Sequence, residues 1–236
     1  MKIAVYTLTR DRLEYTQQCF ASLHQFAGCE FFHVLIDNGS TDGTKEWLAY
    51  EYAHGPSLLR VMPENIGISR ASNLALDLIF EHVPDVDVIC KIDNDCLLTQ
   101  ENTLGQMAEI VMASGEFGPA YVLSPQVEGI VHQPHRAGYT QLAGRRVGLT
   151  SIVGGLFHCV PASIYKQYRY SLDLPLAWGQ DDHFCNWVKS RGGQVGYVEG
   201  ITVEHYEGTD AQAKRFPEYF TRKWRDEKSY YEEKKA

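Results

Sequence analysis

The sequence predicts an α/β protein with a doubly wound, mostly parallel central sheet. Two observations carry this prediction. Short apolar runs alternate with segments of helical periodicity through roughly the first hundred of the 236 residues, as in successive strand–helix units. The composition, 44% hydrophobic and 22% charged, is that of a globular chain with one large core.

The first half of the chain divides into strand-like runs joined through helix-like segments. Strands are expected at 3–8, 31–36, 58–62 and 86–92. Helices are expected at 11–26, at 44–53 and after Gly67, where apolar residues recur at helical spacing. We interpret 86–92 as a continuous apolar strand, covered on both faces at the centre of the sheet. Four such units in a row predict parallel neighbours.

The second half alternates less regularly. Helices are expected at 104–112 and 181–190, and strands at 121–123, 152–160, 195–198 and 201–203. Residues 128–150 combine several glycines with little periodicity, which predicts a long mobile loop. Residues 207–236 predict an amphipathic helical tail that packs its aromatic stripe on the core. The basic residues of the tail leave open a weak membrane-surface contact or self-association.

The charge and cysteine content exclude some classes of protein. A net charge of −8 gives no overall positive field for non-specific nucleic-acid binding. The six cysteines form no CxxC pair, which predicts reduced thiols in a cytoplasmic protein. No signal segment is expected, and no apolar run reaches the roughly 18 residues of a transmembrane helix.

Polar residues follow each of the four N-terminal strands. They are Thr7 and Arg10 after the first strand, Asp37 and Asn38 after the second, Asn65 and Gly67 after the third, and Asp93, Asn94 and Asp95 after the fourth. Turns also use such residues, but ligands of open α/β sheets bind at these carboxyl ends. Asp93 and Asp95 present oxygen ligands for Mg²⁺ or Mn²⁺ bridging a diphosphate, or else form a solvated turn.

Three runs together resemble the family 2 glycosyltransferases, which have the GT-A fold. They are VLIDNGSTDGT at 34–44, NIGISRASN at 65–73 and Asp93-Asn94-Asp95, and the resemblance covers about residues 1–205. It implies an inverting, metal-dependent transferase that takes a nucleotide-diphosphate sugar, with a UDP-sugar favoured. We expect one domain over 1–206, with a nucleotide-sugar-binding half at 1–98 and a smaller, mixed β acceptor-binding half at 99–206.

The resemblance also implies donor and metal residues. Thr7 and Asp37 would border the base, where Asp37 accepts a hydrogen bond from a uracil or thymine imide. Asp95 would be the direct metal ligand, with Asp93 contacting the ribose or the metal shell. His205 would complete that shell, although a lone histidine is as often a structural hydrogen bonder. The donor set would be Thr7, Arg10, Asp37, Asn65, Gly67, Arg70, Asp93 and Asn94.

On the acceptor side, the resemblance matches Gly179-Gln180-Asp181 to the family's Gly-Glu-Asp and makes Asp181 the general base. Asp182 is the base if the register shifts by one, and either aspartate can also cap the helix. The helix dipole at this position favours the anion, so we expect the carboxylate to stand ionised rather than with a raised pKa. Acceptor contacts are expected from Gly154, Gly155 and Trp178.

Other functions and several acceptors stay open at this point. A sugar-phosphate nucleotidyltransferase is disfavoured because Thr7 to Arg10 is not a Gly-rich phosphate loop. A non-catalytic nucleotide- or carbohydrate-binding protein of the same fold is an alternative that Gln180 supports, because the family has Glu there. The acceptor is a saccharide, a lipid-linked glycan, a protein or a modified nucleic-acid base.

Overall fold

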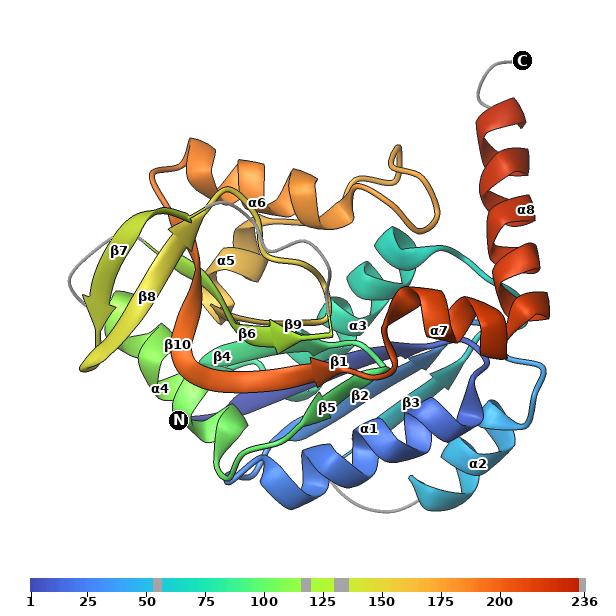
Figure 1. The fold of residues 1–236 in the computed structure, drawn as a ribbon, viewed down its shortest axis with the longest axis horizontal. Coiled ribbons are helices and arrows are strands. Elements are labelled where there is room, and N and C mark those ends of the chain that lie inside the picture. The colour runs from blue at the N-terminus through green and yellow to red at the C-terminus, as the bar shows by residue number, and fades with distance from the viewer. Residues whose placement is uncertain (53–56, 116–119, 130–135, 234–236) are drawn as a thin grey trace.

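The structure is a computed structural model that describes residues 1–52, 57–115, 120–129 and 136–233. Its main feature is one sheet of ten strands, in the order β3-β2-β1-β4-β9-β6-β10-β8-β7, with β5 paired to β10. Figure 1 shows helices on both faces of this sheet. The predicted α/β class with a doubly wound sheet is therefore confirmed.

The N-terminal half forms the parallel part of the sheet. Its strands are β1 (Ile3–Thr9), β2 (Phe32–Asp37), β3 (Ser57–Val61) and β4 (Val88–Ile92), and their neighbouring pairs are parallel. The helices between them are α1 (Leu13–Phe26), α2 (Thr44–Glu51) and α3 (Ile68–His82). Strand order runs outward from β1 to β3 and then returns to β4, so right-handed crossovers place α1 and α2 on one face and α3 on the other (Figure 1). Ligands bind where strand order reverses in this way, here between β1 and β4.

The C-terminal half extends the sheet beyond β4. Its strands are β5 (Cys96–Leu98), β6 (Tyr121–Glu128), β7 (Arg136–Leu142), β8 (Arg145–Thr150), β9 (Phe157–Pro161) and β10 (Gln194–His205). Its helices are α4 (Thr103–Gly115), α5 (Ala162–Gln167) and α6 (Gln180–Ser190). β9 is antiparallel to β4, and β10 is parallel to β6 and antiparallel to β5 and β8. The β5–β10 pairing sets His205 opposite Cys96, next to the acidic motif.

The prediction of a long loop at 128–150 is wrong for the part that the structure describes. β7 and β8 form an antiparallel hairpin there, while residues 130–135 lie outside the described residues. The hairpin turns at Ala143 and Gly144, both with positive φ (46° and 75°). A two-residue turn with two positive φ values normally has Asn or Gly at both positions. Because alanine stands at position 143, the sequence did not indicate a hairpin turn.

Two other strand predictions need correction. The strand expected at 152–160 begins only at Phe157, because residues 151–156 turn toward the carboxyl end of β4. The two strands expected at 195–198 and 201–203 are the single strand β10, with a register shift between Val198 and Thr202. A bulge interrupts the side-chain alternation without ending the strand, so the sequence looked like two elements.

The prediction that the thiols are reduced is wrong for one pair. Cys90 on β4 and Cys159 on β9 stand directly opposite each other, with Cα atoms 4.3 Å apart, and form a disulfide. The two residues are 69 positions apart in sequence, so only the pairing of the strands brings them together. Cys19, Cys29, Cys96 and Cys185 are free thiols.

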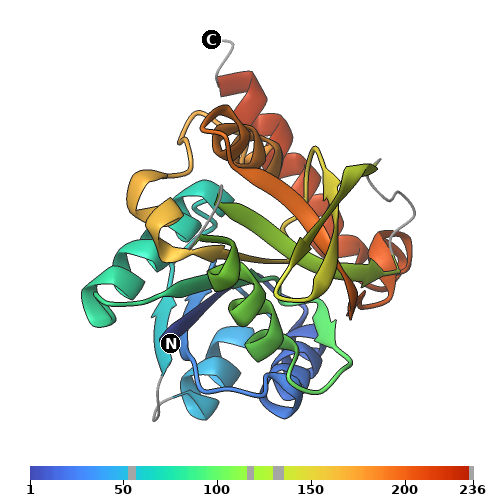
Figure 2. The ribbon, with the colours of Figure 1, turned by 90° about the vertical axis from the view of Figure 1, so that its left-hand side faces the viewer.

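The C-terminal tail is helical, as predicted, but it forms two helices. α7 (Gly208–Arg215) and α8 (Pro217–Glu233) meet at Phe216, where Pro217 begins the second helix. Figures 1 and 2 show α8 on the same side of the sheet as α6. Phe220 packs inward and is 6% exposed, whereas Trp224 is 57% exposed. In the described residues, no helix combines the length and apolar character that crossing a bilayer requires.

Candidate active site

The carboxyl ends of β1 and β4 border a cavity of about 490 Å³, within the usual size range of ligand sites. The other walls come from residues 154–156, residues 176–178, the end of β10 and the helices α7 and α8. Much of the predicted site lies on these walls. The predicted residues that line the cavity are Arg10, Asn65, Asp93, Asn94, Asp95, Gly154, Gly155, Trp178 and His205.

Other predicted residues lie off the cavity wall. Thr7 is fully buried and hydrogen-bonds His33 Nε2 at 3.1 Å. Asp37 is also fully buried, and its carboxylate accepts hydrogen bonds from the Thr9 hydroxyl at 3.0 Å and the Ser40 backbone amide at 3.0 Å. These hydrogen bonds order the turn after β2. The Asp37 carboxylate is therefore bonded to neighbouring residues and does not present an open face to a nucleotide base.

The remaining four donor and base candidates, Gly67, Arg70, Asp181 and Asp182, also lie off the wall and differ in exposure. Gly67 is buried at the start of α3, where the backbone amide of the following residue donates to Leu176 O at 2.7 Å. Arg70 is exposed on α3. Asp182 is exposed on the first turn of α6, while Asp181 beside it is partly buried.

Asp95 is the centre of a buried polar cluster at the end of β4. Its Oδ2 accepts hydrogen bonds from Arg12 Nη1 at 2.8 Å and from Gln212 Nε2 at 3.1 Å, and lies 3.4 Å from His205 Nε2. Burial alone would raise the pKa of Asp95, but the charges of Arg12 and His205 outweigh it and lower that pKa. Burial likewise opposes protonation of His205, yet its hydrogen bond to Asp95 raises its pKa.

The chemistry of this cluster fits a divalent cation. A carboxylate oxygen and an imidazole nitrogen 3.4 Å apart are close enough to be ligands of one ion, and Mn²⁺ accepts both types. In the part of the chain that the structure describes, no group of three or more His, Cys, Asp or Glu side chains could hold a metal. A cation bound to Asp95 and His205 would therefore need substrate phosphates and water as its other ligands, as at many Mg²⁺ sites.

Arg12 is a member of this cluster that the sequence did not reveal. It is 8% exposed, with a left-handed backbone (φ 62°) at the start of α1. Its guanidinium also donates to Asn94 Oδ1 at 2.9 Å and Gln212 Oε1 at 2.6 Å, and its Cζ lies 4.7 Å from the centroid of the Tyr219 ring. Its partners come from the turn after β4 and from α7 and α8, so no local pattern could identify it.

Lys91 is a second buried residue of the candidate site that the sequence did not reveal. It lies within the strand interpreted as apolar throughout, yet its ammonium is buried at the cavity. The Nζ donates to Asp93 Oδ1 and, at 2.6 Å, to the backbone oxygen of Gly155. Burial opposes its charge, but the carboxylates of Asp93 and Asp181 outweigh burial and raise its pKa.

Asp181 is tied to Lys91 through Gly155. The Gly155 backbone amide donates to Asp181 Oδ2 at 2.9 Å, while its carbonyl accepts from Lys91. A Cβ at position 155 would lie 2.6 Å from Lys91 Nζ and 2.9 Å from Asp181 Oδ1, so any larger residue would displace these two side chains. Burial raises the pKa of Asp181, and Lys91 offsets part of this rise. The expectation of an unraised pKa at the helix start is therefore wrong, because desolvation exceeds the effect of the dipole.

Gln180, which stands where the family has Glu, is buried under the loop before α6. Its amide donates to Pro175 O at 2.6 Å, so it anchors that loop.

These geometries agree with what comparison of the sequence with protein families shows. The model of glycosyl transferase family 2 matches residues 4–165. The chain belongs to glycosyl transferase family 2. No curated protein sequence matches the chain.

Solved structures show that this family 2 chain has the GT-A fold. S. aureus TarS in complex with UDP-GlcNAc matches with a TM-score of 0.66 and 15% identity over 90% of this chain and 61% of that chain. GalNAc-T7 with UDP, GalNAc and Mn²⁺ matches with a TM-score of 0.67 and 12% identity over 89% of this chain and 44% of that chain. The mannosyltransferase PcManGT from Pyrobaculum calidifontis, in complex with GDP-Man and Mn²⁺, matches with a TM-score of 0.61 and 14% identity over 86% of this chain and 56% of that chain. The chain spans about 60% of the TarS chain, so these similarities establish the fold alone.

The tail of this family 2 protein forms one wall of the cavity. Tyr219, Phe220, Lys223 and Trp224 of α8 line it, together with Gln212 of α7. Two ion pairs fasten α8 to the segment after β1: Arg10 to Asp226 at 2.6 Å and Arg222 to Asp11 at 2.5 Å. The tail is thus bound beside the carboxyl end of β1, a contact that the sequence did not predict.

Proposed function

We propose that this protein is an inverting glycosyltransferase that transfers a sugar from a nucleotide-diphosphate sugar to a hydroxyl group. The observation that carries the proposal is the chain of contacts from Asp181 through Gly155 and Lys91 to Asp93. It links a desolvated carboxylate, through Gly155 and Lys91 on the cavity wall, to the acidic motif at the end of β4. A base on one side of a sugar and charged groups for its diphosphate on the other are what an inverting transfer requires.

The donor is proposed to be a UDP-sugar. The similar structures of TarS and GalNAc-T7 contain UDP or UDP-GlcNAc, and PcManGT contains GDP-Man. In the present chain, Arg10 and Asn65 line both the main cavity and a neighbouring polar hollow of about 370 Å³ at the ends of β2 and β3. We place the nucleoside in this hollow and the diphosphate between it and Asp95.

Asp95 and His205 are proposed to hold Mn²⁺ or Mg²⁺, with Asp93 near the shell. The cation would neutralise the charge that develops on the departing nucleoside diphosphate. In the structure, Arg12 and Gln212 both donate hydrogen bonds to Asp95 Oδ2. These two residues therefore orient Asp95, and the charged Arg12 carries part of the neutralising role.

Asp181 is proposed to accept the proton of the acceptor hydroxyl. The acceptor oxygen forms a bond to the anomeric carbon while the bond from that carbon to the diphosphate oxygen breaks, and the proton passes to the Asp181 carboxylate. A raised pKa suits this role, because a stronger base accepts the proton more readily near neutral pH. An α-linked donor then gives a β-linked product.

The decisive experiment measures release of free nucleoside diphosphate from UDP-glucose, UDP-GlcNAc, UDP-galactose and GDP-mannose, with Mn²⁺ and without acceptor. The Asp181→Asn variant is expected to lower the release rate by about 10²-fold or more, the usual effect of a lost general base. Its stabilisation by UDP and Mn²⁺ in a thermal-shift assay should stay near that of the wild type. Asp182→Asn is the matched control, because Asp182 is the exposed neighbour on the same turn.

The outcomes separate the remaining hypotheses. Loss of release in Asp182→Asn alone would transfer the role of base to Asp182. Equal loss of binding and release in Asp181→Asn would remove Asp181 from the role of base. Nucleotide binding without any release by the wild type would favour a non-catalytic binding protein.

A further inference from the structure

Two half-exposed indole rings stand on the wall of the cavity, on segments far apart in sequence. Trp178, in the loop before α6, is 53% exposed, and Trp224, on α8, is 57% exposed. Single exposed apolar residues are common on protein surfaces, but two exposed indole rings on the wall of one concavity indicate a ligand surface. Lys223 connects the two segments, because its Nζ lies 4.9 Å from the centroid of the Trp178 ring.

The position of the rings assigns them to the acceptor side. Trp178 lies three positions before Asp181, on the segment that leads into the same helix turn. An acceptor whose hydroxyl reaches Asp181 would then lie next to the segment that carries Trp178. The polar hollow beside Arg10 and Asn65, which neither ring lines, gives the nucleoside a separate place.

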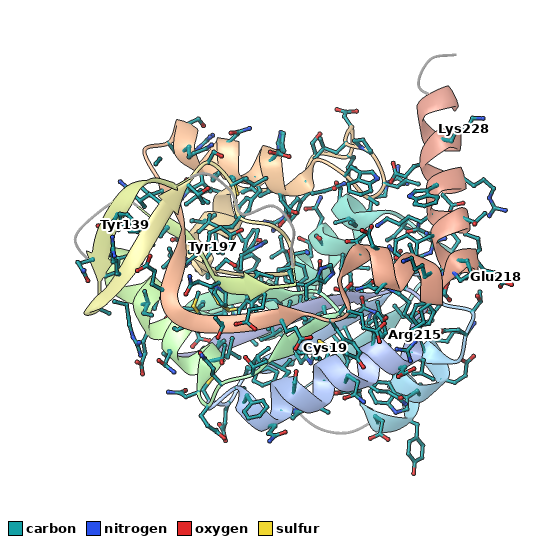
Figure 3. The ribbon with its side chains drawn as sticks, in the orientation of Figure 1. Cys19, Tyr139, Tyr197, Arg215, Glu218 and Lys228 are labelled. Atoms are coloured by element: carbon teal, nitrogen blue, oxygen red, sulfur yellow. A yellow bond between two sulfur atoms is a disulfide. The ribbon has the colours of Figure 1, made fainter. Side chains whose placement is uncertain are left out.

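The surface of α8 argues against a membrane as the occupant. Glu218 points away from the body of the protein, and Lys228 also lies on α8 (Figure 3). Of the residues of α8 whose side chains the structure describes, Trp224 is the single large apolar one with an exposed ring, and Arg225 and Lys228 are exposed beside it. A helix bound in a bilayer surface needs a continuous apolar face, which this side of α8 lacks.

We propose that Trp178 and Trp224 form a subsite for a sugar ring, so that the acceptor is a saccharide bound partly by the C-terminal helix. This inference rests on the proposed function. The faces of indole carry negative charge density, so they attract the polarised C–H groups on the flat side of a pyranose ring. Lys223 at the edge of the subsite supplies a donor for ring hydroxyls.

Intrinsic fluorescence tests the subsite directly. The chain has four tryptophans, so a Trp47→Phe/Trp187→Phe variant keeps Trp178 and Trp224 as its only tryptophans, and tryptophan emission then reports on these two rings. The probes are cellotetraose, chitotetraose, maltotetraose and mannotetraose, then UDP with Mn²⁺, then vesicles of phosphatidylcholine and phosphatidylglycerol. At least one saccharide should shift the emission saturably. Trp178→Ala or Trp224→Ala should weaken that binding by about tenfold or more, measured by calorimetry.

The matched control is Glu218→Ala, on the outer side of α8, and its saccharide affinity should equal that of the wild type. The subsite assignment is overturned if no saccharide shifts the emission, or if only UDP or only the vesicles do. Donor hydrolysis by the wild type with no saccharide response would remove the subsite and leave the proposed function standing. Saccharide binding by a protein that binds no nucleotide sugar would remove the proposed function instead.

Discussion

The contact between Lys91, Gly155 and Asp181 predicts that Gly155→Ala damages catalysis far more than it damages the fold. A methyl group at this position would lie 2.9 Å from Asp181 Oδ1 and 2.6 Å from Lys91 Nζ, whereas ordinary contacts begin at 3.4 Å. The Asp181 carboxylate must therefore retreat by about half an ångström, and Lys91 by somewhat more. Because displacing a reacting group by about 1 Å costs on the order of 10²-fold, we expect about a tenfold loss of turnover.

Gly154 provides the control for this experiment. A Cβ added there has nothing within 4 Å, so Gly154→Ala adds the same methyl group to the next residue without a contact. The assay compares the rate of nucleoside diphosphate release in both variants with their UDP-induced thermal shift and their melting temperature. If the two variants lose the same activity, or if Gly155→Ala loses activity only in proportion to its unfolding, the contact with Asp181 has no catalytic role.

The structure makes three further predictions. Asp37→Ala should destabilise the fold by roughly 2–3 kcal/mol, because it removes buried hydrogen bonds to a carboxylate. Urea unfolding measures this loss. Unchanged stability together with weaker UDP binding would instead support the donor role expected from the sequence. Burial lowers the pKa of His33 and of His158 to about 3, so the unfolded chain binds more protons than the folded one below the ordinary value of 6.5. The free energy of unfolding should therefore fall as the pH falls from 6.5 toward 3, by about 1.4 kcal/mol per pH unit for each histidine. If a His158→Gln variant loses stability with falling pH as steeply as the wild type, this prediction is wrong. Finally, the denatured, unreduced protein should titrate four thiols rather than six, because Cys90 and Cys159 are paired; six would refute the disulfide.

The parts of the fold that could be predicted from the sequence are those that depend on local pattern. The strands β1 to β4 and the helices α1 to α3 follow from apolar runs and helical spacing, and their positions agree closely with the structure. Elements that depend on an irregularity were predicted less well. Ala143 disguised the turn between β7 and β8, and the bulge in β10 divided one strand into two.

The candidate site shows the same division. The residues that follow strands, such as Asn65 and Asp95, reach the cavity because parallel strands bring their carboxyl ends to one edge. Asp37 follows a strand equally well but turns inward to Ser40. The pattern fixes where a polar residue lies along the strand, and packing decides which way its side chain points.

By itself, the sequence determined the class of the fold, the family and the edge of the sheet where the candidate site lies. Only the tertiary structure placed Arg12 and Gln212 on Asp95, Lys91 on Asp93 and Gly155, and the tail against the segment that follows β1. The contact of Arg12 with Asp95 spans 83 positions and that of Gln212 spans 117. Local pattern holds no information about such pairs, because the burial that makes them strong exists only once distant segments have packed together.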